Sequence, residues 1–212
     1  VDYSKVNYSK APYANEPSNT ITYAECHDNH VLWDKLAISA KDATEAERKE
    51  MHKLALSIVL TSQGISFLHA GTEFLRSKKG HENSYNSGDS INAIDWSLKT
   101  KNKDVFDYVR ALIKMRKEHP AFRMKTAKDV ASNIHFLSDT NGIISYTING
   151  KAVKDQWSKV LVVLNANPTD KKISLPEGSW QRISLPGQPL YAQPVKTSII
   201  TLPYNCTILY QK

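Results

Sequence analysis

Cysteines and long apolar runs are scarce in this chain of 212 residues, and each shortage excludes a class of protein. The two cysteines, Cys26 and Cys206, are too few for a disulfide scaffold and form no CxxC metal pair. No stretch approaches the roughly 18 apolar residues of a membrane span, so we expect no integral membrane protein. The first residues, Val1 to Lys5, have neither the charged leader nor the apolar core of a signal peptide. Any leader would lie upstream, so the compartment, cytoplasmic or secreted, stays open.

Concentrated basic charge is also missing, although the formal net charge is +7. Residues 1–124 hold 18 Lys and Arg against 16 Asp and Glu, a balance of +2, and residues 125–212 hold 10 against 5, a balance of +5. The basic residues of the second part are spread singly, without an arginine cluster. Nucleic-acid binders concentrate such residues on one face. We therefore expect a solvated surface and neither a nucleic-acid nor a membrane partner.

The first part of the chain alternates predicted strands and helices. Thr20 to Ala24 alternates apolar and polar residues, which is typical of a short strand, and Ile65 to Ala70 predicts a second strand. Between them, Thr44 and Glu47 form a capping box, which predicts the start of a helix. The apolar positions of that helix fall on one stripe, which we expect to face the core: Met51, Leu54, Ala55, Ile58 and Val59.

A polar loop and a second helix follow the second predicted strand. Residues 76–92 are rich in Gly, Ser and Asn and predict a loop. A helix is predicted from about Lys103 to His119, with Pro120 marking its exit. Strand, helix, strand, loop and helix in this order indicate an α/β arrangement with parallel strands. The expected inward positions of the second helix are Val105, Val109, Leu112 and Ile113.

The second part of the chain has a different pattern. Six of the nine prolines lie after residue 124, and no amphipathic helix is evident there. Asp139 to Gly142 predicts a hairpin turn, because its Asn-Gly pair tolerates positive φ. These features indicate an antiparallel β-sandwich, with a boundary near residues 123–128. The expected strands are Ile134–Leu137, Ile143–Ile148, Val160–Leu164, Trp180–Ser184, Ser198–Leu202 and Cys206–Tyr210.

Two strand–helix units are too few to bury a parallel sheet. Parallel strands occur almost only where both faces of the sheet are covered. We therefore expect the first part of the chain to be the end of a larger fold, with an apolar flank that requires partner strands.

The residues with the most evident chemistry follow the first predicted strand, in the segment Glu25 to His30. In α/β folds the carboxyl ends of the strands carry the active site. Two other interpretations stay open at this point. Cys26, His27 and His30 would suit zinc, but no further ligands follow at metal spacing. His27 and Asp28 would also suit a pair that merely satisfies itself within a loop.

A carboxylate beside an imidazole also suits a site that cleaves sugars. Glycoside hydrolysis passes through an oxocarbenium-like transition state, and hydrogen bonds to ring hydroxyls strengthen as positive charge grows. A carboxylate accepts such bonds and offsets the charge, and an imidazole N–H donates to the same oxygens. The later segment Glu82 to Asn92 adds Tyr, Asn and Asp side chains that suit hydroxyl recognition and stacking on a pyranose. Taken alone, that segment is equally an ordinary polar loop.

The order of these motifs resembles type I pullulanases, which are debranching members of the α-amylase superfamily of glycoside hydrolases. Ile21 to Leu36, ITYAECHDNHVLWDKL, resembles the segment of their seventh barrel strand. Ile65 to Lys78 resembles their eighth strand, Ser84 to Trp96 the loop that follows, and Leu112 to Phe122 their closing helix. The resemblance is close for residues 15–125 and looser beyond them.

This resemblance implies both a fold and a reaction. It places the last two strand–helix units of a (β/α)8 barrel over residues 1–124 and a C-terminal antiparallel β-sandwich over residues 125–212. The parent enzyme is expected to hydrolyse α-1,6-glucosidic branch linkages in pullulan, starch dextrins or glycogen, with retention. Two alternatives stay open: another enzyme of the superfamily, such as an α-1,4 amylase or an isoamylase, and a non-catalytic carbohydrate-binding fragment.

The resemblance also implies roles for individual residues. Asp28 would be the third catalytic carboxylate, which stabilises the transition state, and His27 the neighbouring ligand of a sugar hydroxyl. Cys26 departs from the serine expected at its position, and we expect Trp33 in the core rather than as a sugar platform. The implied substrate contacts are Asn29, Tyr85, Asn86 and Asp89.

Two catalytic groups of the family have no counterpart in this chain. The nucleophilic aspartate and the acid/base glutamate lie on earlier barrel strands, and neither Glu25 nor Glu73 matches them. We therefore expect the chain to be catalytically incomplete by itself. We also expect the N-terminal remainder of the enzyme, or a second copy, to pack on the open sheet edge. Calcium is common among amylase relatives, but no Asp-rich ligand loop marks a cofactor site in these residues.

Overall fold

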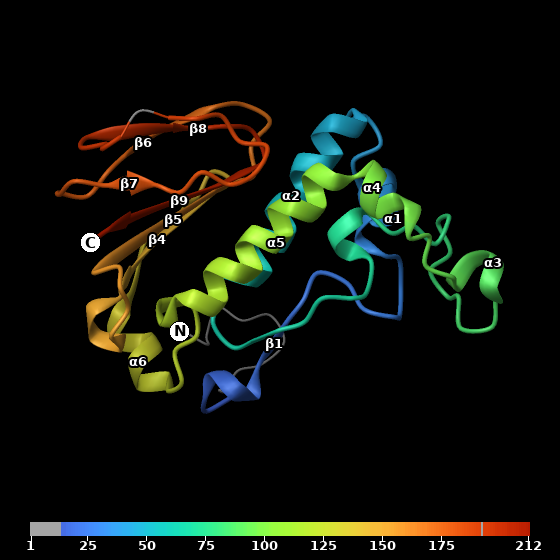
Figure 1. The fold of residues 1–212 in the computed structure, drawn as a ribbon, viewed down its shortest axis with the longest axis horizontal. Helices are drawn as coiled ribbons and strands as arrows, with labels where there is room; N and C mark the ends of the chain where they lie inside the picture. Colours follow the sequence, from blue (N-terminus) through green and yellow to red (C-terminus); the bar gives the residue numbers. More distant parts are fainter. Residues whose placement is uncertain (1–13, 192) are drawn as a thin grey trace.

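The computed structural model describes residues 14–191 and 193–212. Most of its β-strands gather at one side, the long helices α2 (Glu45–Thr61) and α5 (Lys103–Glu118) run side by side in the middle, and α3 (Asp89–Asn92) lies at the far end (Figure 1). The molecule therefore has a strand–helix half and a β-rich half, which meet along these two helices.

The strand–helix half contains one short parallel pair of strands. β1 (Ile21–Thr22) and β2 (Ile65–Ser66) pair with Ile21 opposite Ile65 and Thr22 opposite Ser66. The prediction of parallel strands is thus confirmed, although each paired segment is shorter than predicted. Within the described residues this sheet has two strands, so each strand has a partner on one edge only.

Local sequence signals explain how the chain passes from β1 to β2. α1 (Leu32–Ser39) follows β1, and the predicted capping box then starts α2. The Thr44 hydroxyl accepts the Glu47 N–H at 3.2 Å, and the Glu47 carboxylate accepts the Thr44 N–H at 2.8 Å. The Thr44 N–H, together with the Thr44 hydroxyl that also donates to the Glu47 carboxylate at 2.7 Å, lowers the pKa of Glu47. After the helix, Gly64 has a φ of +87°, and a Cβ there would lie 2.3 Å from Thr20 Oγ1, so the turn into β2 requires glycine.

The helix α5 packs against α2 through the side that the sequence predicted. Val105, Val109 and Leu112 are fully buried, and Ile113 is half-buried. Arg116 then ties the end of α2 to the end of α5, because its guanidinium donates to four backbone carbonyls. The acceptors are Leu60 at 3.1 Å, Ser62 at 2.6 Å, Gly64 at 2.7 Å and Phe122 at 2.7 Å. The remaining short helices are α4 (Ser97–Lys101) and the 3-10 turns Pro17–Asn19, Thr72–Phe74, Pro120–Phe122 and Lys151–Val153.

The β-rich half contains a five-stranded and a two-stranded sheet, both antiparallel. The order in the larger sheet is β3-β4-β5-β9-β7, and β6 pairs with β8. The predicted hairpin joins β3 to β4, with φ values of 54° at Asn141 and 70° at Gly142. The strands are β3 (Ile134–Thr140), β4 (Ile143–Asn149), β5 (Lys159–Asn165), β6 (Lys171–Ser174), β7 (Gln181–Arg182), β8 (Ser198–Thr201) and β9 (Asn205–Gln211).

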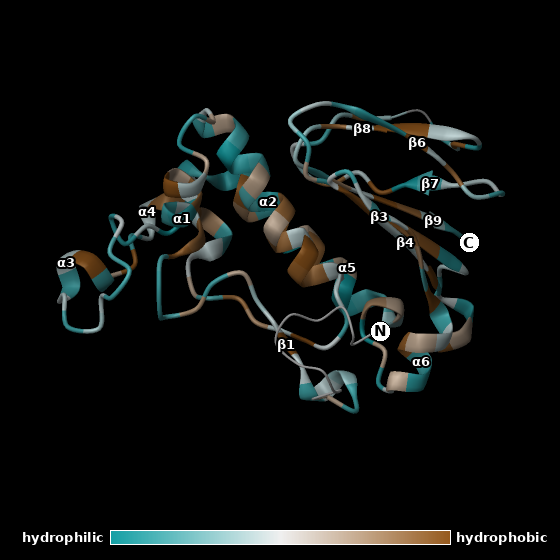
Figure 2. Ribbon diagram, turned by 180° about the vertical axis from the view of Figure 1, so that it is seen from behind, coloured by the Kyte–Doolittle hydropathy of each residue, from teal (hydrophilic) through white to brown (hydrophobic). Residues whose placement is uncertain are grey.

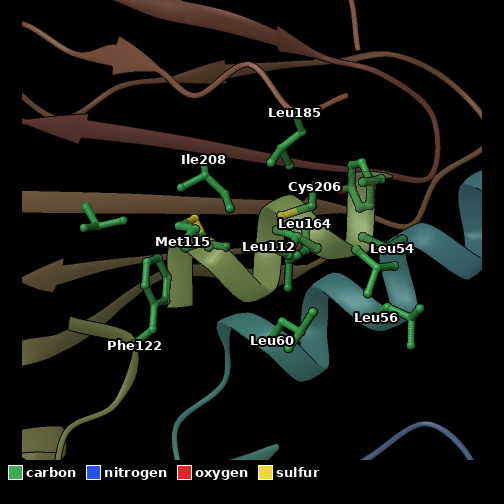
Figure 3. Packing of buried hydrophobic residues seen from close by; sticks show 14 of the residues in the cluster. Leu54, Leu56, Leu60, Leu112, Met115, Phe122, Leu164, Leu185, Cys206 and Ile208 are labelled. Atoms are coloured by element: carbon green, nitrogen blue, oxygen red, sulfur yellow. The ribbon is translucent and has the colours of Figure 1, made fainter. Parts of the chain in front are cut away.

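The main core lies between the two long helices and one face of the five-stranded sheet. Leu112 and Met115 from α5 and Leu60 from α2 converge there with Ile208 and Cys206 from β9 (Figure 3). Both α2 and the sheet strands accordingly carry strongly hydrophobic segments (Figure 2). A second cluster, on the opposite face of the sheet, includes Leu161, Val163, Trp180, Ile199 and Leu209. The larger sheet is therefore the middle layer of three.

A polar and aromatic contact also joins the two halves near the end of α5. His119 Nδ1 lies 2.7 Å from Asp155 Oδ1, and the other oxygen of Asp155 accepts the Ala121 N–H at 2.9 Å. The His119 ring stacks on Trp157 at 3.3 Å between centroids, and Trp157 stacks on Tyr210 at 4.5 Å. The β-rich half is thus attached to α5 by directional contacts as well as by apolar packing.

An apolar face of the β1–β2 pair remains exposed. Ile21, Tyr23, Ile65 and Phe67 are between 42% and 61% exposed, and the Tyr23 and Phe67 rings lie 6.0 Å apart. We call these four residues the open strand face. A parallel sheet normally has both faces covered, so this surface differs from that of a finished α/β fold.

The structure differs from the sequence-based expectations in secondary structure and in burial. The second part of the chain does contain a helix, α6 (Ala127–Asn133), which starts where the Thr126 hydroxyl accepts the Asp129 N–H at 3.0 Å. Its seven residues are too few to show amphipathic periodicity. β6 was not predicted, because its Lys-Lys-Ile-Ser sequence holds one apolar residue. Ile58 is 40% exposed, although Leu54 and Val59 of the same predicted stripe are buried, because α2 packs on the core through Leu54, Leu56 and Leu60.

None of the helices in the described part of the chain is both long and apolar enough to cross a membrane.

Candidate active site

Glu25 holds together the two ends of the loop that follows β1. Its side chain is buried, and a carboxylate oxygen accepts the backbone N–H of Leu32, the first residue of α1. Burial raises the pKa of Glu25, and the hydrogen bond from Leu32 opposes part of that rise. Residues 26–31 are thereby closed into a loop at the carboxyl end of a strand.

His27 and Asp28 point into solvent from this loop. Their side chains are 83% and 73% exposed, and His27 Nε2 lies 3.7 Å from Asp28 Oδ2. This distance is too long for a hydrogen bond, so the pair does not satisfy itself in the way that the loop interpretation requires. Asn29, also exposed, adopts a left-handed φ of 62°, which Asn tolerates better than most residues. All three side chains are accessible to a ligand.

The zinc interpretation receives no support from the geometry of this loop. Among residues 14–191 and 193–212, no group of three or more His, Cys, Asp or Glu side chains is placed to hold a metal ion. His30 lies instead 3.7 Å from a carboxylate oxygen of Glu82, and Cys26 Sγ lies 3.7 Å from the backbone oxygen of Asp28.

Asp34 fixes the start of the second polar loop. This buried residue of α1 accepts hydrogen bonds from the Ser77 hydroxyl at 2.6 Å and from the backbone N–H groups of Lys78 at 2.8 Å and Gly80 at 3.0 Å. Three donors on one carboxylate hold the chain at residues 77–80 against α1.

The far end of the same loop is held by Arg76. Its guanidinium donates to the backbone oxygens of Ala70 at 3.1 Å and Asn92 at 2.5 Å. The Asn92 side chain in turn donates to the backbone oxygen of Ser84 at 2.6 Å. Because residues 84 and 92 are tied together, the segment 85–91 projects between them.

The projecting segment carries the other expected substrate contacts. Tyr85 is 84% exposed, Asn86 and Asp89 are also exposed, and Asp89 is the first residue of α3. Lys78 connects this segment to the first loop, because its ammonium donates to the Ser84 hydroxyl at 2.8 Å and to the His27 backbone oxygen at 3.3 Å. The structure therefore joins the two predicted site segments through one side chain.

Sequence reasoning assigned no role to Lys78, Asp34 or Arg76, all of which are buried. The segment Arg76-Ser77-Lys78-Lys79 is typical of a solvated loop, and its spacing indicates no partner. The signal that these residues matter is their burial, which depends on segments distant in the sequence.

The pKa values of two histidines behind the loops are lowered. His52 is fully buried in α2, its Nε2–H donates to the Thr72 backbone oxygen at 2.8 Å, and burial lowers its pKa to about 4. Trp33 is half-buried beside it, packed on the core with its ring 6.2 Å from His52. His69 Nε2 lies 3.4 Å from an Arg76 nitrogen, which can only donate. Burial, followed by the charge of Arg76, lowers the pKa of His69.

Comparison with known proteins identifies pullulanases as relatives of this chain. The family model described as "Pullulanase, all-beta domain" matches residues 130–188. The pullulanase of Bacillus subtilis strain 168 is 39% identical over 166 residues, which cover 78% of this chain and 23% of that protein. The chain therefore spans about a quarter of the length of that relative.

Solved structures give the same relationship. A pullulanase from Bacillus acidopullulyticus has a TM-score of 0.88 and 40% identity, covering 93% of this chain and 25% of that one. The type I pullulanase from Bacillus subtilis strain 168 complexed with maltose has a TM-score of 0.89 and 34% identity, covering 95% of this chain and 28% of that one.

Proposed function

This chain is related to the C-terminal portion of type I pullulanases, as its motifs predicted, and on that premise we propose that it supplies part of the active site of a debranching enzyme. The proposed reaction is hydrolysis of α-1,6-glucosidic branch linkages in pullulan, starch dextrins or glycogen, with retention. The observation that carries the proposal is the exposed His27–Asp28 pair at the carboxyl end of a strand in a chain with these relatives.

Asp28 acts in this proposal as the stabiliser of the transition state. As the glycosidic bond breaks, positive charge develops on the sugar ring, and hydrogen bonds from ring hydroxyls to a carboxylate become stronger. Asp28 accepts those bonds, and His27 binds a neighbouring hydroxyl through its ring nitrogen. The 3.7 Å between the two side chains leaves each one able to bond to sugar rather than to the other.

The projecting segment supplies further contacts to the glucan. Asn29 extends the His27–Asp28 pair, and Asn86 and Asp89 offer amide and carboxylate groups to hydroxyls. Tyr85, which is 84% exposed, offers an aromatic face for stacking on a pyranose. The relative complexed with maltose supports an α-glucan as the substrate class.

Additional barrel elements would cover the surfaces that this chain leaves open. We assign β1 and β2 to the last two strands of a (β/α)8 barrel. The open strand face then packs on the remaining strands. Met51, Ala55 and Ile58, on the least buried side of α2, then pack on a neighbouring helix. The covering polypeptide is the N-terminal remainder of the enzyme or a second copy of the chain.

The same assignment makes this chain catalytically incomplete. A retaining glycosidase needs a nucleophile and an acid/base carboxyl about 5–5.5 Å apart across the scissile bond. We assign both groups to the covering polypeptide, because the two nearby glutamates of this chain are already engaged. The buried Glu25 carboxylate accepts the Leu32 N–H, and the Glu73 carboxylate accepts the Gly71 N–H at 3.0 Å. This chain by itself is therefore expected to hydrolyse no glycosidic bond.

The test is an Asp28→Asn substitution in the complete enzyme that contains this chain. Asn keeps the shape but loses the charge, so kcat on pullulan should fall by about 10²–10³-fold, as when an enzyme loses one group that stabilises a transition state. Asp42→Asn, at an exposed carboxylate between α1 and α2, is the matched control and should leave kcat unchanged. An Asp28→Asn enzyme with kcat within twofold of wild type would refute the assignment.

A further inference from the structure

Lys78 is a buried lysine between the two segments that carry the proposed sugar contacts. It is 4% exposed, and its ammonium contacts the Ser84 hydroxyl at 2.8 Å and the His27 backbone oxygen at 3.3 Å. Its own backbone N–H donates to Asp34 at 2.8 Å. Both ends of this long, flexible side chain are therefore held in place.

Ion pairing does not account for the burial of this charge. Among the described residues, the lysines within 4 Å of a carboxylate are Lys49, Lys53, Lys103 and Lys114, so Lys78 is not among them. A buried ammonium is costly unless hydrogen bonds compensate for lost hydration. Its compensation here comes from neutral oxygens of two separate loops, which must stay in place to provide it.

Each oxygen that Lys78 contacts belongs to a proposed sugar ligand or to the residue beside one. His27 precedes Asp28, and Ser84 precedes Tyr85. The Ser84 backbone oxygen also accepts the Asn92 side chain at 2.6 Å, which closes the base of the projecting segment. A shift of the ammonium would therefore move both loops relative to each other.

We propose that Lys78 is a positioning residue, which sets the distance between Asp28 and the Tyr85–Asp89 segment so that both engage one sugar chain. This inference rests on the proposed function. Displacement of a catalytic group by about 1 Å can cost 10²-fold in rate. Loss of Lys78 should therefore lower kcat, because Asp28 acts in the transition state, and should raise KM for long branched maltodextrins, because the projecting segment binds the chain.

The experiment compares Lys78→Met, Lys78→Arg and Ser84→Ala in the complete enzyme, with Lys117→Met, at an exposed lysine of α5, as the control. Steady-state kinetics on pullulan should show kcat reduced by roughly 10- to 100-fold in Lys78→Met. Lys78→Arg should restore part of that loss, because it returns a cation with donors. Ser84→Ala, which removes one acceptor only, should give a smaller loss. The control should match wild type.

Amide hydrogen exchange of the same proteins separates this inference from the proposed function. Lys78→Met should raise exchange in residues 26–30 and 84–90 together and leave α5 unchanged. If wild type hydrolyses no α-1,6 linkage, the proposed function fails, and exchange alone decides the role of Lys78. A folded Lys78→Met protein with unchanged exchange in both loops, or with kcat and KM within twofold of wild type, overturns the proposal. If Lys78→Met does not fold, Ser84→Ala is judged by the same two measurements.

Discussion

β5 and the β1–β2 pair show how differently the two halves of the molecule bury their strands. In β5, Val160 and Val162 face the long helices, whereas Leu161 and Val163 face the cluster on the other side of the sheet. The β1–β2 pair leaves the open strand face uncovered.

The comparison shows that the β-rich half covers both faces of its strands with side chains of this chain, whereas the strand–helix half does not. Every strand of the large sheet is antiparallel to its neighbours, and every partner is supplied by this chain, whether through a hairpin, as for β3 and β4, or by a distant segment, as for β5 and β9. A parallel pair needs crossover helices and further strands, and two strand–helix units do not provide enough of them. We therefore expect the β-rich half to resist perturbation at exposed sites and the strand–helix half to depend on a covering partner.

The largest expected effect on stability comes from a cavity between the five-stranded and the two-stranded sheet. Leu161→Ala removes a fully buried side chain between two sheets, which should lower the free energy of unfolding by roughly 3–5 kcal/mol in a urea titration. The matched control, Ile200→Ala, changes a residue of β8 that is 46% exposed and should cost about 0.5 kcal/mol or less. Similar costs at the two positions would contradict the three-layer packing.

Acid should act first on the strand–helix half. The pKa of His52 falls from its ordinary value near 6.5 to about 4 in the fold, so the unfolded chain binds a proton more readily. The stability that neutral His52 contributes is complete above pH 6.5 and is lost as the pH falls toward 4, a change of roughly 3 kcal/mol. Unfolding free energies measured across this range should show the loss in wild type.

Two variants test the assignment of this acid sensitivity. His52→Gln keeps a donor for the Thr72 oxygen but has no titrating group, so its stability should change less between pH 6.5 and pH 4. His135→Gln, at an exposed histidine of β3, should keep the wild-type profile. A His52→Gln profile as steep as that of wild type would assign the acid sensitivity to another group.

The smallest expected effect on the stability of this chain comes from a substitution on the open strand face. Ile65 is 49% exposed, so Ile65→Ala should cost only about 0.5 kcal/mol in this chain. In the complete enzyme the same substitution should cost roughly 2–4 kcal/mol, because partner strands would bury the side chain. Thermal or urea unfolding of both proteins gives the comparison. Equal costs in the two would remove the support for a covering partner.

Most of the fold could be predicted wherever the signal was local. The capping box of Thr44 and Glu47 and the turn at Asn141 and Gly142 act within four residues, and both were predicted correctly. The burial of α2 was predicted only in part, because periodicity shows which residues share a side of a helix but not how far a neighbour covers that side: Leu54 and Val59 are buried as predicted, and Ile58 is not. Ile58 is the clearest example, since it lies on the predicted stripe and is exposed.

The candidate site divides in the same way. Its exposed side chains, His27 and Asp28, were proposed from the order of motifs, because they lie together in the sequence, and the structure places both in solvent. The side chains that hold the two loops were not found, because Lys78 reaches an oxygen 51 positions away and Asp34 accepts a hydrogen bond from Ser77, which is 43 positions away.

The amino-acid sequence by itself determined the start of α2 and the hairpin at Asn141 and Gly142, since those depend on residues a few positions apart. Only the tertiary structure decided that Lys78 would be buried between two loops and that His52 would be buried and neutral. The physical reason is that burial depends on which segments pack around a side chain, and those segments are distant from it in the sequence.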